Sequence, residues 1–219
     1  MKKKVVNIAV DIETLSKRST AAIIGIAAKA FSLGEHKAKE GSVFKRAVDA
    51  TSCAMLGMDF DNVTIEWWSK KPTAVKEQFS YGYSIGMALR ELTDFVKDVK
   101  TLNGAEEVVV WCQGTDFDIS ILRNAFVLVN NDREEKTIPW KYLNVRDSRT
   151  FIHEGVRLID PSVDNPYSII PENKNWVEHD AMSDCDQLIH NVTWVNDKIS
   201  ELLTANKSKE NADETAEQV

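Results

Sequence analysis

The sequence predicts an α/β fold in which helices flank a mixed five-stranded sheet. Three β-rich segments lie within residues 5–48, and helical patterns then alternate with two further short strand-like segments. The chain has 219 residues, of which 43% are hydrophobic and 28% are charged. That length and composition are usual for one globular domain with a sizeable core.

The first three predicted strands follow one another closely. Residues 5–12 are β-rich and mostly apolar, residues 21–33 follow a polar turn, and residues 42–48 follow Gly41. The connections between them are short, which favours an antiparallel meander. Asp61 and Pro72 then mark the starts of two short helices.

Residues 84–99 give the clearest helical signal in the chain. Their apolar residues recur at the 3.6-residue period and form one face, made of Ile85, Ala88, Leu89, Leu92, Phe95, Val96 and Val99. Residues 107–112 are a short apolar run bounded by glycine-containing turns, the pattern of a buried strand. We expect the remaining elements to be a helix at 117–130, a strand at 142–147, a short helix at 148–154, a loop at 155–178 and a last helix at 180–203.

We interpret residues 1–204 as a single domain and the polar residues 205–219 as a disordered tail. No apolar run approaches the roughly 18 residues that a membrane span needs. Polar residues also interrupt the apolar stretch behind the first lysines, so a signal peptide is not indicated and we expect a cytoplasmic protein. The three cysteines are far apart without a Cys-x-x-Cys pair, which predicts reduced thiols at Cys53, Cys112 and Cys185.

The formal net charge of −7 argues against tight binding of nucleic acid by the whole surface. It does not exclude a nuclease, because a basic groove can coexist with an acidic remainder. Bound cations also neutralise clustered carboxylates, so the formal charge overstates what a polyanionic substrate meets.

Asp11 and Glu13 form the first candidate motif. Residues i and i+2 of a strand point to the same face, so the two carboxylates project together at the end of the first strand. Adjacent carboxylates repel each other unless a cation lies between them, and a hard divalent cation with oxygen ligands is the usual solution. An exposed strand end is the structural alternative.

A second motif follows the strand at residues 107–112, where a polar turn leads into the helix that begins at about Phe117. We interpret Asp116 as an N-cap, because a carboxylate there accepts hydrogen bonds from helix backbone N–H groups. Asp118 lies just inside the helix between Phe117 and Ile119, so a capping role explains it less well than it explains Asp116. The third motif is the run from His179 to Asp184, which opens the last helix.

Together these motifs resemble the DEDDh (DnaQ-like) exonuclease superfamily of 3′→5′ exonucleases. Its Asp-x-Glu-Thr motif matches Asp11-Ile12-Glu13-Thr14, its Phe-Asp dipeptide matches Phe117-Asp118, and its His-x-Ala-x-x-Asp motif spans His179 to Asp184. The order of elements is similar to the ribonuclease H-like fold. Three further segments resemble phage DexA-type exonucleases and exoribonuclease-like relatives: Ile65-Glu66-Trp67-Trp68, Pro139-Trp140-Lys141-Tyr142 and Arg146-Asp147-Ser148-Arg149-Thr150. A phage protein would act in the host cytoplasm.

The resemblance implies hydrolysis of phosphodiester bonds with two Mg²⁺ or Mn²⁺ ions. Asp11, Glu13, Asp118 and Asp184 would hold the metal ions, and His179 would be the general base. The backbone around Thr14 and Leu15 would hold the 3′-terminal nucleotide, with Leu15 as a wedge. Trp68 and Phe117 would supply stacking, although core packing is an alternative for both. Arg149 and Arg146 are candidate phosphate contacts, with an ion pair to Asp147 as the alternative, and Lys70 and Lys71 are read as solvated.

The favoured substrate is single-stranded DNA, with RNA as the alternative, because no motif marks contacts to the 2′-hydroxyl. A homodimer is compatible with the sequence. Two other classes compete with this hypothesis. A His-Asp phosphohydrolase would use His153, His179-Asp180 and Asp197, but its all-helical fold conflicts with the strand-rich start of the chain. A non-catalytic binding module would not need all five site residues.

Overall fold

The structure is a computed structural model, and it describes residues 3–33 and 42–216. Five strands form one sheet in the order β3-β2-β1-β4-β5. The strands are β1 (Val5–Thr14), β2 (Ile23–Phe31), β3 (Val43–Ala47), β4 (Glu107–Cys112) and β5 (Val145–Asp147). β1, β2 and β3 pair antiparallel, whereas β4 is parallel to β1 and β5 is parallel to β4. The predicted α/β class, the meander and the mixed five-stranded sheet are therefore confirmed.

The helices are α1 (Ala50–Ala54), α2 (Asn62–Ser69), α3 (Thr73–Glu77), α4 (Ile85–Leu102), α5 (Ser120–Asn130), α6 (Ser148–Ile159) and α7 (Ala181–Ala216). Three short turns complete the description: a π-helical turn η1 (Thr115–Ile119) and the 3₁₀ turns η2 (Tyr142–Asn144) and η3 (Pro166–Ser168). α6 extends past the predicted 148–154 to Ile159, so the loop before α7 is shorter than the sequence suggests.

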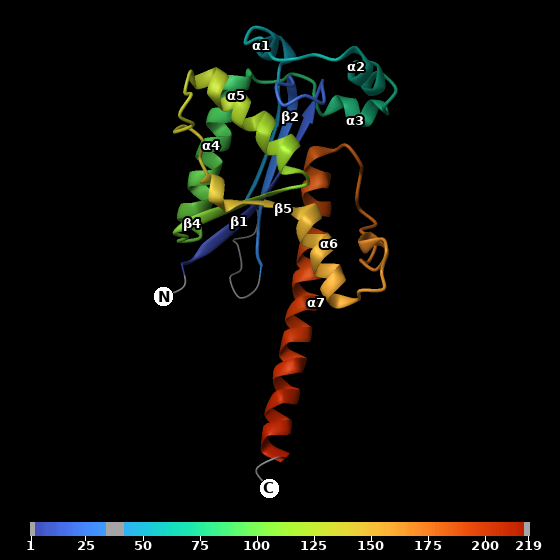
Figure 1. Ribbon diagram of the computed structural model, residues 1–219. Helices are drawn as coiled ribbons and strands as arrows, with labels where there is room; N and C mark the ends of the chain where they lie inside the picture. Colours follow the sequence, from blue (N-terminus) through green and yellow to red (C-terminus); the bar gives the residue numbers. More distant parts are fainter. Residues whose placement is uncertain (1–2, 34–41, 217–219) are drawn as a thin grey trace.

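The alternation of side chains along β1 divides the core into two layers. Val6, Ile8, Val10 and Ile12 belong to a cluster that also contains the apolar face of α4 and residues of α5. Ala9 belongs to a second cluster, which contains residues of α6 and α7. Figure 1 shows the corresponding arrangement, with α4 and α5 on one side of the strands and α6 and α7 on the other. Odd-numbered residues of β1 therefore face α6 and α7.

The helix α7 continues to Ala216, whereas the sequence predicts its end at about residue 203. Its C-terminal part projects away from the sheet in Figure 1. Lys, Glu and Ala, which are frequent after residue 204, have high helix propensity, so polar composition alone does not end a helix. The domain boundary at residue 204 and the disordered tail stay predictions, and residues 217–219 lie outside the described part of the chain. Within the described residues, none of the helices combines the length and apolar character needed to cross a membrane.

Candidate active site

The first wall of the candidate site is the C-terminal end of β1. Pairing between β1 and β4 ends at Ala9 and Trp111, whereas pairing with β2 continues to Thr14. Asp11 and Glu13 follow Ala9 on the face toward α6 and α7, as the two-residue period of the strand predicts. Asp11 is partly buried, and Glu13 is only 8% exposed.

The second wall is the turn that follows β4. Gly114 has a φ of +136°, a conformation that favours glycine, and a Cβ atom there would lie 3.3 Å from Nη1 of Arg149. The π-helical turn then begins at Thr115, and Gly114 occupies the cap position. Asp116 is thus inside the first turn, and its predicted N-cap role is wrong because the helical structure begins earlier than expected. Asp118 is 4% exposed and faces the interior.

The third wall is the first turn of α7. Asp180 holds this turn, because its Oδ1 accepts hydrogen bonds from the backbone N–H groups of Met182 and Ser183 at 3.1 and 3.0 Å. Its other oxygen pairs with Lys45 at 2.7 Å. Asp186 pairs with Lys29 at 2.5 Å. Asp184, one turn into the helix, is therefore the acid of this group that is left to face the cleft.

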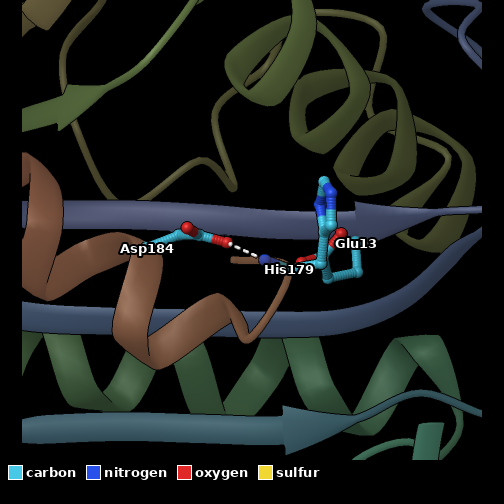
Figure 2. Close-up of side chains that lie close together, drawn as sticks. All are labelled: Glu13, His179 and Asp184. Atoms are coloured by element: carbon cyan, nitrogen blue, oxygen red, sulfur yellow. Dashed lines mark hydrogen bonds between the residues drawn. The ribbon is translucent and has the colours of Figure 1, made fainter. Parts of the chain in front are cut away.

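The three walls meet around one cleft. Glu13, His179 and Asp184 each offer a ligand atom, and these atoms lie within 4.8 Å of one another. Figure 2 shows the three side chains, with the backbone N–H of His179 donating to Asp184 at 3.0 Å. Asp11 and Asp118 line the same cleft, which has a volume of about 600 Å³. The structure thus brings together all five residues that the motifs single out.

His179 is held by its aromatic neighbours. Its φ of +67° lies in the left-handed region, which is uncommon for a residue with a side chain. Its ring packs edge-on against Trp67, with 4.6 Å between ring centroids, and lies 6.2 Å from the ring of Trp68. Lys71 lies 3.9 Å above the ring of Trp67, so it is not simply solvated as the sequence suggests.

Burial and mutual repulsion disfavour the ionised forms of the carboxyl groups in the cleft and raise their pKa values. Burial, followed by repulsion from Asp184 and Asp118, raises the pKa of Glu13 to about 9. Burial raises the pKa of Asp118 to about 7 and, with repulsion from Asp118 and Glu13, holds the pKa of Asp11 well above its usual range. Burial also raises the pKa of Asp184. A set of buried carboxyl groups that repel one another in this way could hold divalent cations, which favour oxygen donors and offset the repulsion.

The pKa of His179 moves in the opposite direction to those of the carboxyl groups. Burial and the nearby charge of Lys71 lower the pKa of its ring below the usual value. The imidazole is therefore neutral near pH 7 and able to accept a proton.

A second cavity, of about 380 Å³, adjoins the first and shares Ile12, Glu13, Phe117 and His179 with it. Thr14, Trp67 and Trp68 are among its other lining residues. Trp68 is only 6% exposed, and its indole N–H donates to the carbonyl oxygen of Thr14 at 2.8 Å. This places Trp68 as a support for the end of β1, whereas Trp67, 40% exposed, presents the more open ring. Leu15, the predicted wedge, packs against the main core cluster.

Arg149 is exposed at the edge of the first cavity. Asp147, its predicted ion-pair partner, instead caps α6 by accepting from the backbone N–H of Thr150 at 2.8 Å and also accepts from that of Thr115 at 3.1 Å. Arg146 donates to the carbonyl oxygens of Leu143 and Val145. Within the described residues neither arginine forms an ion pair with Asp147, but the charge of Arg149 favours the ionised forms of Asp147 and Asp118.

Besides lining residues such as Gln113, Gln187 and Asn191, three residues near the cleft are not predicted from the sequence as site residues. Trp67 and Lys71 come from the segment around α2, and Trp176 lies in the loop before α7. The sequence offers a signal for Trp67, which lies in the segment Ile65-Glu66-Trp67-Trp68 that resembles known exonucleases, but none for Lys71 or Trp176. The three cysteines are free and buried, as expected. His153 packs against Tyr167, and the five-stranded sheet excludes the all-helical phosphohydrolase alternative.

Comparison with known proteins agrees with this geometry. A family model described as the 3′-5′ exoribonuclease Rv2179c-like domain matches residues 6–196. No curated protein sequence matches this chain. Among solved structures, cell-death related nuclease 4 (CRN-4) is similar, with a TM-score of 0.58 and 18% sequence identity. The similarity covers 90% of this chain, which spans 64% of that protein, and it supports the predicted ribonuclease H-like fold.

Proposed function

This chain belongs to the Rv2179c-like 3′-5′ exoribonuclease domain family, within the DEDDh exonuclease superfamily, and from this premise we propose that it removes nucleotides one at a time from the 3′ end of single-stranded RNA. The reaction is metal-dependent hydrolysis of a phosphodiester bond that releases nucleoside 5′-monophosphates. The observation that carries the proposal is the convergence of four carboxylates and one neutral histidine in a single cleft.

The four carboxylates would hold two divalent cations. Asp11, Glu13 and Asp184 would hold one cation, and Asp118 would help to hold the other. The grouping of the Glu13, His179 and Asp184 ligand atoms within 4.8 Å supports a metal position at that end of the cleft. When bound, the cations supply an activated water and stabilise the charge on the leaving oxygen.

His179 is the general base, taking the proton from the attacking water. Its lowered pKa supports this role, because a base must be neutral before it accepts a proton. The imidazole ring of His179 packs edge-on against Trp67, and this contact orients it. The contact is between rings and does not need a hydrogen bond from either ring nitrogen. Lys71 contributes by keeping the resting imidazole deprotonated.

The second cavity receives the 3′-terminal nucleotide. Its apolar and aromatic lining suits a nucleobase, and base stacking on an aromatic side chain is worth roughly 1–3 kcal/mol. Phe117 lines both cavities, so it lies where the terminal nucleotide meets the scissile phosphate. The backbone of Thr14 and Leu15 contacts the terminal nucleotide, with Trp68 fixing the Thr14 carbonyl. Arg149 binds a phosphate of the chain on the side of the first cavity.

Single-stranded DNA is the second candidate substrate. The description of the family supports RNA. The Ile65-Glu66-Trp67-Trp68 segment, which resembles DexA-type exonucleases, supports DNA. RNA carries a 2′-hydroxyl at each sugar and DNA does not, so a direct comparison of the two decides between them.

The test uses RNA and DNA oligomers of one sequence, labelled at the 5′ end and incubated with Mg²⁺ or Mn²⁺. A ladder shortening from the 3′ end, faster on RNA and abolished by EDTA, is the expected result. Asp11→Ala should lose nearly all activity, whereas Asp116→Asn, which changes an exposed acid of the adjacent turn, should retain it. Faster loss of DNA would reverse the substrate assignment, and metal-independent or internal cleavage would refute the proposed function. Light scattering on the same sample measures whether the protein is a monomer or the homodimer that the sequence allows.

A further inference from the structure

Trp176 makes a contact with the candidate metal site that the proposed function does not use. This residue lies in the loop between η3 and α7, and its indole N–H donates to Oδ1 of Asp184 at 2.7 Å. The other carboxylate oxygen, Oδ2, accepts the backbone N–H of His179 at 3.0 Å. Each oxygen of Asp184 therefore accepts one hydrogen bond from the same short loop.

Two further hydrogen bonds hold this loop in place. The backbone N–H of Val177 donates to Oγ of Ser183 at 2.7 Å, which ties the loop to the first turn of α7. The side-chain amide of Gln78, at the end of α3, donates to the carbonyl oxygen of His179 at 2.7 Å. Hydrogen bonds to α7 and to the segment around α3 thus hold the loop that carries the two donors to Asp184.

Two fixed donors determine how the carboxylate is turned. A lone carboxylate on a helix rotates about its terminal side-chain bond, which has a broad energy profile. One N–H on each oxygen fixes the plane of the group, while an ionised carboxylate with about four lone-pair sites keeps acceptor capacity on both oxygens. Hydrogen bonds of this kind, made by residues that do not themselves touch the metal, orient metal ligands and typically affect metal affinity 10- to 100-fold.

We propose that Trp176 is a positioning residue, whose indole N–H orients the Asp184 carboxylate toward a divalent cation. The inference rests on the proposed function, because it assumes that Asp184 is a metal ligand. It assigns the role to the N–H group and not to the aromatic ring. Trp176 is 44% exposed and lines the cleft, so its ring is also in reach of substrate, and the experiment must separate the two contributions.

The separating variant is Trp176→Phe, which keeps an aromatic ring and removes the N–H donor. Trp194→Phe is the matched control, because it removes an indole from α7 at a position packed in the second core cluster. Mn²⁺ binding is measured by titration calorimetry on the protein without nucleic acid, and circular dichroism checks that each variant is folded. We expect Trp176→Phe to bind Mn²⁺ about 10- to 100-fold more weakly than the wild type, and Trp194→Phe to bind it equally well.

Turnover gives a second readout. Because the defect is in metal binding, raising the Mn²⁺ concentration should restore most of the kcat of Trp176→Phe, with the KM for the oligonucleotide little changed. A folded Trp176→Phe protein with wild-type Mn²⁺ affinity would overturn the inference and leave the proposed function intact. A raised KM with normal Mn²⁺ affinity would assign the ring to substrate stacking instead and overturn it equally. Failure of the wild type to bind Mn²⁺ would overturn the proposed function as well.

Discussion

Adding Mn²⁺ to the metal-free protein at about pH 7.5 should release protons into the buffer. Burial and repulsion between like charges keep protons on the carboxyl groups of the cleft when no cation is present, and a cation displaces them because it binds the ionised form. The number of protons released therefore reports how far the carboxyl groups that bind the cation were protonated before it bound.

The magnitude follows from the raised pKa values. A group with a pKa of about 9, such as Glu13, is almost fully protonated at that pH and releases about one proton. Asp118, with a pKa of about 7, is about one quarter protonated and contributes about 0.2. Asp11 adds to this sum because its pKa also lies well above the usual range. His179 adds nothing, because its pKa is lowered and its ring is already neutral.

Titration calorimetry in buffers of different ionisation enthalpy measures the released protons directly. We expect at least about one proton per protein near pH 7.5, and more near pH 6, where Asp118 is mostly protonated before the metal binds. Glu13→Gln should lower the release by about one proton, whereas Asp98→Asn, at an exposed position on α4 away from the cleft, should leave it unchanged. Metal binding with no proton release, or a release that does not change between these two pH values, would refute the reasoning from buried, mutually repelling carboxylates.

Three further predictions follow from the same structure. His179→Ala should lower the single-turnover rate by about 10²- to 10⁴-fold while calorimetry shows Mn²⁺ still bound, and loss of Mn²⁺ binding would make His179 a metal ligand instead of the base. In the metal-free protein the pKa of Glu13 is raised from 4.5 to about 9. Between these two pH values the native state therefore binds more protons than the unfolded chain. The free energy of unfolding should therefore fall as pH rises across that interval, and saturating Mg²⁺ should flatten the decline; a rise in denaturation midpoint with pH in the metal-free protein contradicts this. A chain ending at residue 204 should keep wild-type activity and melting temperature, since the domain is predicted to end there, and a large loss of either would extend the domain into the rest of α7.

Most of the sheet and most of the site follow from local patterns in the sequence. The two-residue period of a strand is enough to place Asp11 and Glu13 on one face, and the 3.6-residue period is enough to place the buried side of α4. The start of the helix after β4 is less predictable. The positive φ of Gly114 and the π-helical turn shift it by two residues, and this moves Asp116 from a cap position into the first turn.

Contacts between distant segments could not be predicted in this way. Gln78 and His179 are 101 residues apart in the sequence, and only the packing of the α2–α3 segment beside the loop before α7 brings them together. The same packing places Trp67 and Lys71 beside His179 and gives Trp68 its partner at Thr14. No local periodicity encodes such pairs. They depend on the full three-dimensional arrangement.

Part of the candidate site lies on the central sheet, and another part lies on the loop before α7. Asp11 and Glu13 belong to β1, which is hydrogen-bonded to β2 along this end and to β4 up to Ala9. His179 and Trp176 belong instead to a loop that is held by a few hydrogen bonds to side chains of Ser183, Gln78 and Asp184 and by the packing of His179 against Trp67. Segments held in this way open with a smaller free energy than central strands. If His179 is the general base, as we propose, local opening of the loop would withdraw it and stop hydrolysis while the sheet, with its strand carboxylates, stays folded.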